Sequence, residues 1–229
     1  MTLIENRINA VDSIEGILSK KEQRLLHELA QRSRGNIVEI GSWKGLSTVC
    51  LALGLEKGYK VYAIDPHKGS ALHKMEGNKN SYKEFMNNII KLNVQDLVIP
   101  MVMTSKKAFE SWDKGEIDLL WIDGNHEYEY VKYDVENWTK LLNENGILAM
   151  HDFASPIDID VTKVVFNTVV NKMEFVKVID KIILFRNTGI GTHGINEIKL
   201  RFITLYRKLL YKNYNSFPIK VVRNIKRII

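Results

Sequence analysis

The sequence is poor in cysteine and proline, with one and four among 229 residues. A single cysteine, Cys50, excludes an intramolecular disulfide and any metal site built from several thiolates. Apolar runs stay short of the roughly 18 residues that suggest a membrane span, and the first residues lack the apolar core of a signal peptide. We therefore expect a cytoplasmic protein that is neither secreted nor membrane-spanning, with Cys50 buried as a small apolar side chain.

Basic residues gather near the end of the chain. The net charge is +6, and residues 197–229 hold nine Lys or Arg against one Glu. Apolar residues recur there at helical spacing in two sets: Ile198, Phe202, Leu205 and Leu209, then Val221, Val222, Ile225 and Ile228. After a flexible hinge at 188–194, this pattern predicts a basic amphipathic helical tail. Such a tail either lies on the inner face of an anionic membrane or acts as an arm for homo-oligomerisation.

Short apolar runs alternate with amphipathic stretches over most of the chain. The expected strands are 37–41, 60–64, 97–103, 117–122 and 146–150, followed by a hairpin over 173–187 that turns at Asp180. The expected helices are 19–33, 45–56, 80–92, 105–113, 127–142 and 160–172. This alternation predicts an α/β, Rossmann-like fold with a seven-stranded, mostly parallel sheet and a C-terminal antiparallel hairpin. We divide the chain into an N-terminal helical segment (1–34), a catalytic domain (35–187) and the tail (188–229).

The turn after the first expected strand has the composition of a cofactor-binding turn. Glu39 ends the strand, Gly41, Ser42 and Gly45 form the turn, and Ser47 opens the next helix. Glycines let the backbone approach a ligand closely, and a helix N-terminus offers N–H groups that lack partners.

An acid at the end of the second strand supports the same interpretation. Asp65 follows Gly45 by 20 residues and is placed to bind ribose hydroxyls. A nicotinamide dinucleotide site needs a second glycine where this chain has Trp43, which would block the pyrophosphate. The turn instead resembles the first motif of the class I S-adenosylmethionine-dependent methyltransferases.

Ionisable residues also follow the fourth and fifth expected strands. Asp123 ends one of them, and His151 and Asp152 end the other. Ligands of open parallel sheets bind outside the carboxyl ends of the strands, so these residues and Asp65 should share one rim.

The segment 122–152 resembles the small metal-dependent sugar and macrolide O-methyltransferases, whose pattern reads roughly IDGDHxYxxxxxDxxxWxxxLxxGGxxxxHD. The chain agrees at Ile122, Asp123, Gly124, His126, Tyr128, Asp134, Trp138, Leu142, Gly146, His151 and Asp152. It departs at Asn125 and Asn145, where an acid and a glycine are usual. With the first motif, the resemblance covers about residues 20–186.

The resemblance implies a role for each residue that matches. Asp123, His151 and Asp152 would bind Mg²⁺ or Mn²⁺, His126 would be the general base, and Asp123 and His151 would also take part in catalysis. S-adenosylmethionine would contact Glu39, Gly41, Ser42, Gly45, Ser47, Asp65, Ser105 and Asp123. Asp134 and Trp138 would brace the fold, and the segment 66–80 would be either a substrate lid or a solvated loop.

These features together predict an S-adenosylmethionine-dependent O-methyltransferase acting on a sugar hydroxyl of a glycan or glycosylated metabolite. Two alternatives remain: a metal-independent methyltransferase acting on another small molecule or nucleic acid, and a hydroxylase-like protein without transferase activity. Amino-directed nucleic-acid enzymes tend to carry Asn/Asp-Pro-Pro-aromatic after the fourth strand. Here the chain reads Asp-Gly-Asn-His from Asp123 to His126, which argues against nucleic acid.

Overall fold

The computed structural model describes residues 11–56, 58–68 and 81–215, with side chains as far as residue 210. The strands are β1 (Ile37–Ile40), β2 (Val61–Ile64), β3 (Val98–Met101), β4 (Ile117–Ile122), β5 (Leu142–Met150), β6 (Glu174–Ile179) and β7 (Ile182–Arg186). The α-helices are α2 (Lys20–Arg32), α3 (Leu46–Gly54), α5 (Tyr82–Lys91), α6 (Ser105–Glu110), α7 (Tyr128–Trp138), α8 (Ile159–Val164) and α9 (Ile195–Asn215). Short turns are η1 (Val11–Ser13), η2 (Thr139–Leu141) and the π-helical η3 (Val165–Val169).

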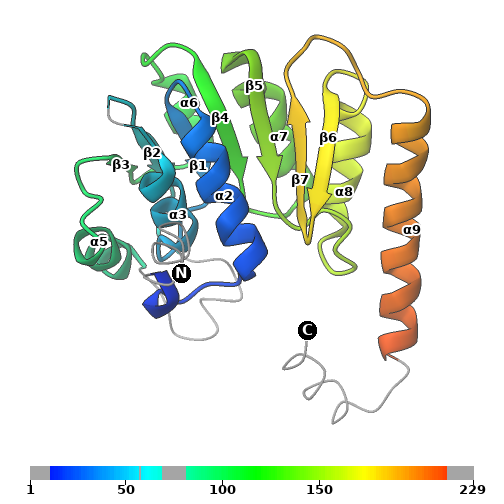
Figure 1. The fold of residues 1–229 in the computed structure, drawn as a ribbon, viewed down its shortest axis with the longest axis horizontal. Coiled ribbons are helices and arrows are strands. Elements are labelled where there is room, and N and C mark those ends of the chain that lie inside the picture. The colour runs from blue at the N-terminus through cyan, green and yellow to red at the C-terminus, as the bar shows by residue number, and fades with distance from the viewer. Residues whose placement is uncertain (1–10, 57, 69–80, 216–229) are drawn as a thin grey trace.

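The strands form one seven-stranded sheet in the order β3-β2-β1-β4-β5-β7-β6, with helices on both faces (Figure 1). β1 to β5 pair in parallel, and β7 runs antiparallel to its neighbours β5 and β6. This confirms the predicted fold class, including the C-terminal hairpin.

Alternation along β4 explains why both faces are covered. Leu119 and Trp121 join a core with residues of α2, α3 and α5, whereas Leu120 and Ile122 join a second core with residues of α6, α7 and α8. Successive side chains of a strand point to opposite faces, so an apolar strand of this kind needs helices on each side. Cys50 is fully buried in the first core, as predicted.

β5 begins earlier than predicted, and the helix before it ends earlier. The sequence predicted a helix to residue 142 and a strand from 146, but α7 ends at Trp138 and β5 starts at Leu142. The amide of Asn187 donates to the carbonyl oxygens of Leu142 and Asn143, and the N–H of Asn145 donates to the Asn187 carbonyl. These bonds draw the segment into the sheet, with an irregularity in the pairing to β4.

The predicted hinge is anchored rather than free. Thr192 is buried, and its hydroxyl accepts from the N–H of Phe175 and donates to the carbonyl of Met173. A side chain at Gly191 would meet the backbone of Asn171 at 2.5 Å. The sequence suggested flexibility because glycines are frequent there, but Gly191 and Thr192 fix the middle of the turn against the preceding segment.

Helix α9 follows this turn and packs on the domain, with Leu200 fully buried. None of the described helices combines the length and apolar run needed to cross a bilayer. Most of the predicted lid (66–80) and the second amphipathic set after Pro218 lie outside the described residues.

Candidate functional site

The turn between β1 and α3 passes directly against the residues after β4. Gly41 has φ +92°, and a Cβ there would lie 2.2 Å from the backbone oxygen of Asp123. Gly45 has φ +88° and is the N-cap of α3, without a side-chain cap among the described residues. The first N–H groups of α3 are therefore available to a polar ligand.

Glu39 lies beneath this turn and joins β1 to α3. Its carboxyl group is fully buried and accepts hydrogen bonds from the hydroxyls of Ser47 and Thr48. Burial raises the pKa of Glu39 to about 8, although the two hydroxyls oppose that rise. Glu39 and Ser47, both predicted cofactor contacts, are thus engaged with each other below the turn.

Asp65 fixes the outer side of the same turn. Its two carboxylate oxygens accept from the backbone N–H groups of Trp43, at 2.8 Å, and His67, at 2.6 Å. A carboxylate has about four acceptor positions, so capacity remains for ribose hydroxyls. The Ser42 hydroxyl is buried and has no hydrogen-bond partner among the described residues. These features fit a nucleoside-containing cofactor at the turn.

Ser105 lies at the first turn of α6, facing the carboxyl group of Asp134 on α7. Asp134 is buried, and burial raises its pKa to about 7, although the nearby Ser105 side chain opposes that rise. Asp134 and the fully buried Trp138 therefore brace the fold, as predicted.

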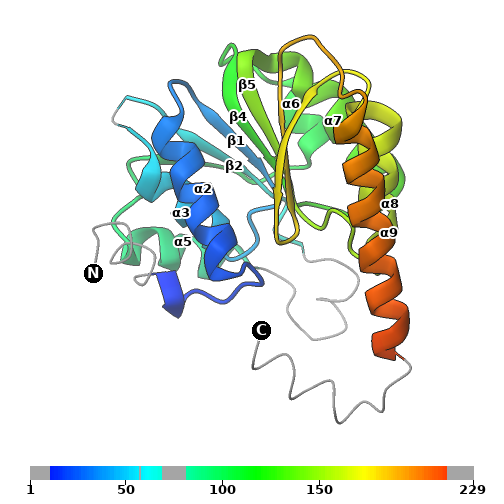
Figure 2. The same cartoon turned by 45° about the vertical axis from the view of Figure 1, so that its right-hand side comes forward.

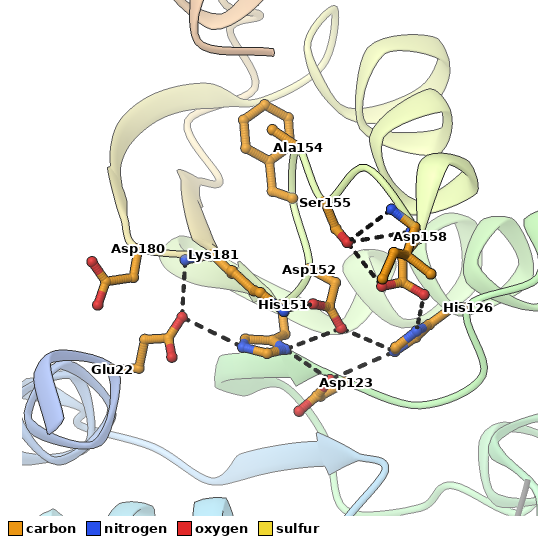
Figure 3. Close-up of polar contacts among 12 residues, drawn as sticks. Glu22, Asp123, His126, His151, Asp152, Ala154, Ser155, Asp158, Asp180 and Lys181 are labelled. Carbon is orange, nitrogen blue, oxygen red and sulfur yellow. Dashed lines mark hydrogen bonds and ion pairs between the residues drawn. The ribbon is translucent and has the colours of Figure 1, made fainter. Parts of the chain in front are cut away.

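Asp123, His126, His151 and Asp152, together called the acid–histidine cluster below, meet at the carboxyl ends of β4 and β5 (Figure 3). Backbone hydrogen bonds pair the ends of neighbouring strands. The N–H of Asp123 donates to the carbonyl of Ile40, and that of His151 donates to the carbonyl of Ile122. The parallel register thus gathers groups that are far apart in the sequence.

His126 turns one ring nitrogen toward the cluster and the other away from it. Its Nε2 lies 3.4 Å from Asp152 Oδ2 and 3.8 Å from Asp123 Oδ1. Its Nδ1 lies 2.8 Å from Asp158 Oδ1. The nearby carboxylate of Asp123 is the main cause that raises the pKa of His126 to about 9, with Asp158 and Asp152 adding to it against burial.

His151 is buried among three carboxylates. Its Nδ1 lies 3.3 Å from Asp123 Oδ1 and 3.2 Å from Asp152 Oδ2, and its Nε2 lies 3.4 Å from Glu22 Oε1. Burial opposes a charge on this imidazole, but the surrounding acids outweigh it and raise its pKa to about 12. These acids favour the protonated imidazole, whose charge would neutralise part of theirs, whereas His151 acting as a metal ligand would be neutral.

Asp152 is the centre of the cluster. Its Oδ2 faces both imidazoles, and its Oδ1 accepts from Lys181 Nζ at 2.9 Å. Burial favours the protonated acid, but His151 and Lys181 prevail and hold the pKa of Asp152 well below its usual range. Asp152 also has φ +54°, in the left-handed region that non-glycine residues rarely adopt.

Asp123, His126 and Asp152 offer three ligand atoms within 4.8 Å of one another. Two carboxylates and an imidazole suit a divalent cation such as Mg²⁺ or Mn²⁺. The third member of this group is His126, whereas the sequence analysis assigned that place to His151. His151 lies against the same carboxylate oxygens through Nδ1, so it is also within reach of an ion held there.

Three further residues complete the surroundings of the cluster. Glu22 on α2 accepts from the N–H of Lys181 and lies beside His151, and Asp158 positions His126. Glu22 also forms a capping box with Ser19 at the start of α2. No local pattern reveals the other contacts, because α2 and the β6–β7 turn reach the cluster only in the folded chain.

Residues 38–153, just over half of the chain, match the family described as methyltransferase domain. The chain belongs to the methyltransferase-domain family. Its sheet order is that of the class I methyltransferase fold.

Several solved structures have the same fold as this chain. Cofactor-bound Rv0187 from MTB has a TM-score of 0.60 and 15% identity, over 81% of this chain and 88% of that one. The Bacillus cereus O-methyltransferase in complex with SAH has a TM-score of 0.57 and 16% identity, over 80% and 88%. The O-methyltransferase NovP has a TM-score of 0.58 and 17% identity, over 81% and 79%.

A curated relative, the uncharacterized protein y4gI of Sinorhizobium fredii, is 28% identical over 133 residues. These residues make up 56% of this methyltransferase but only 14% of the relative, so the chain spans a small part of that protein's length.

Proposed function

We propose that this methyltransferase transfers a methyl group from S-adenosylmethionine to a hydroxyl of a glycan or a sugar-containing small molecule, with a bound Mg²⁺ or Mn²⁺ assisting. The observation that carries the proposal is the convergence of Asp123, His126 and Asp152 beside the glycine turn. Gly41 lies against the backbone of Asp123, so a methyl donor seated on the turn and an acceptor at the cluster would be neighbours.

The donor set favours a hard divalent cation. Asp123 and Asp152 would hold the ion through carboxylate oxygens, the ligands that Mg²⁺ prefers. When bound, such an ion lowers the pKa of a coordinated hydroxyl group. Mg²⁺ keeps several exchangeable positions, which two neighbouring hydroxyls of a sugar can fill. His151 remains a candidate for a further ligand or for a contact to the substrate.

His126 is suited to receive the proton of the acceptor hydroxyl. Its Nδ1–H donates to Asp158, which leaves the Nε2 lone pair directed toward Asp123 and Asp152. A base must be neutral, and the carboxylates around His126 raise its pKa to about 9. Neutralising those carboxylates with a cation removes the main cause of that rise. The oxygen then bonds to the methyl carbon as the methyl–sulfur bond breaks, and His126 keeps the proton.

Titration of S-adenosylhomocysteine into matched variants tests the two halves of the site separately. Asp65→Ala should abolish binding, because Asp65 shapes the turn and faces the ribose position. Asp152→Ala should leave binding intact, since Asp152 belongs to the acceptor side. Absence of binding to the wild type would overturn the cofactor assignment for this chain.

Transfer of a labelled methyl group to sugar diols, with and without chelator, tests the remaining part of the proposal. We expect transfer that chelation abolishes and that Mg²⁺ or Mn²⁺ restores. Transfer that withstands chelation would favour the metal-independent alternative, and S-adenosylhomocysteine binding without transfer to any hydroxyl acceptor would favour the non-transferase alternative.

A further inference from the structure

Helix α9 stands along one side of the molecule beside α8, in both views (Figures 1 and 2). A narrow strip of α9 packs on the domain. Leu200 and Thr204 are buried there, and Ile203 packs against the core that contains residues of α6, α7 and α8. Arg201 lies over the ring of Phe166, 4.9 Å from its centroid. The domain therefore holds α9 firmly by one side only.

The opposite side of α9 is apolar and exposed. We call this side the α9 apolar face; it comprises Ile198, Phe202, Leu205, Tyr206, Leu209 and Leu210, which are 50–67% exposed. Single exposed apolar residues are normal, but a contiguous set on one helix marks an interaction surface. With a rise of about 1.5 Å per residue, the stretch from Ile198 to Leu209 is about 16 Å long.

The charges around this face indicate what binds it. Among the described side chains of α9, four are basic and one, Glu197, is acidic and pairs with Arg201. Lys199 and Lys208 are exposed on α9. Two copies of this chain meeting through α9 would bring an excess of positive charge together, whereas interfaces between amphipathic helices usually pair both signs at their margins. An anionic surface that is apolar beneath its charges complements the face better.

We propose that the α9 apolar face docks the protein onto anionic phospholipid membranes, with its apolar side chains entering the interface and its lysines at the headgroups. The guanidinium of Arg207 donates to the carbonyl oxygens of Phe153 and Asp180. Phe153 directly follows Asp152, so docking through α9 holds the acid–histidine cluster close to the same membrane. This inference goes beyond the proposed transfer reaction and does not depend on it.

Sedimentation of the full chain with phospholipid vesicles tests the proposal. The probes are phosphatidylcholine vesicles and vesicles that also contain phosphatidylserine. We expect binding to the anionic vesicles, weakened by salt. Each cation near the surface contributes about 1 kcal/mol, or about fivefold, so Lys199→Gln with Lys208→Gln should weaken binding about 25-fold. Phe202→Ser with Leu209→Ser should weaken it at least about tenfold.

Matched variants keep the test specific to α9. Ile17→Ser with Ile90→Ser removes two exposed apolar side chains elsewhere, and Lys83→Gln with Lys140→Gln removes two exposed cations elsewhere. Both controls should bind vesicles as the wild type does. All the substituted side chains are solvent-exposed, and every variant should keep the wild-type circular dichroism spectrum and thermal unfolding midpoint, which verifies folding.

Several outcomes would overturn the proposal. Unchanged vesicle binding by the Phe202/Leu209 variant would assign the binding to charge alone. Failure of the wild type to bind anionic vesicles would refute docking altogether. If the wild type instead dimerised in ultracentrifugation and the Phe202/Leu209 variant were monomeric, the face would belong to a second copy.

Discussion

The two halves of the site are built from very different lengths of chain. The cofactor half lies within residues 39–67: the glycine turn, the buried Glu39 below it and Asp65 beside it. The acid–histidine cluster lies at the ends of β4 and β5, and it is contacted by α2, the loop at Asp158 and the β6–β7 turn. A local site depends mainly on backbone shape, whereas an assembled one depends on charges that balance each other across the fold.

Removing a side chain from the acid–histidine cluster should cause the largest loss of activity. His126→Gln should lower kcat by about 10²- to 10⁴-fold, the usual contribution of a general base. If His126 serves only as the base, the affinities for S-adenosylhomocysteine and Mg²⁺ should stay unchanged, which calorimetry measures beside the rate. Asp158→Asn, which disturbs only the Nδ1 side, should cause a smaller loss. Mg²⁺ affinity that falls together with kcat would make His126 a ligand instead.

In the cofactor half, binding should be most sensitive to a change in the backbone. Gly41→Ala places a Cβ 2.2 Å from the Asp123 oxygen at φ +92°, so it should abolish S-adenosylhomocysteine binding. Overpacking and backbone strain should also lower the free energy of unfolding by about 2–5 kcal/mol.

Gly58→Ala is the control for backbone strain alone. Gly58 has φ +105°, and a Cβ there would meet nothing within 4 Å. The Gly58→Ala variant should lose only about 1–2 kcal/mol in free energy of unfolding, measured by chemical denaturation, and should keep its cofactor binding. Equal losses in the two variants would mean that contact between the turn and Asp123 is unimportant.

The buried carboxyl group of Asp134 on α7 should make stability depend on pH, because burial raises its pKa. Because the folded-state pKa of Asp134 is raised to about 7, its contribution is fully present below about pH 4 and is lost as pH rises through 7. Asp134→Asn should remove this loss. The difference in the free energy of unfolding between variant and wild type should therefore shift in favour of the variant by up to about 4 kcal/mol between pH 4 and pH 8. Parallel denaturation curves across this range would contradict the assignment.

The smallest effect should come from Glu22, which reaches the cluster from α2. Glu22→Gln and Ser19→Ala both weaken the capping box, so each should cost about 1 kcal/mol of stability. Only Glu22→Gln removes an acid beside His151 and should lower the pKa of that imidazole, observable by NMR titration. A similar change in His151 on Ser19→Ala would show that the effect passes through helix stability.

The sequence could predict the features that rest on local pattern. Glycines at a strand end, acids at neighbouring strand ends and the final hairpin all follow from periodicity and turn chemistry. Glu22, Asp158 and Lys181 could not be predicted as neighbours of the cluster, because only the packing of α2, the loop before α8 and the hairpin turn brings them there.

Helix α9 shows a second limit. Periodicity correctly identified the stripe containing Ile198, Phe202, Leu205 and Leu209, but it could not reveal that the domain buries Leu200 and Thr204 instead. An apolar stripe predicts a surface that needs a partner, and it leaves open whether that partner is the same domain.

The most direct test of the account is calorimetric titration of Mg²⁺, and then Mn²⁺, into the protein saturated with S-adenosylhomocysteine. Asp152→Asn is the comparison, because Asp152 meets both histidines and belongs to the proposed ligand set. The account predicts saturable binding by the wild type that weakens at least about tenfold in the variant. Equal affinities, or no binding by the wild type, would contradict a metal site at the ends of β4 and β5.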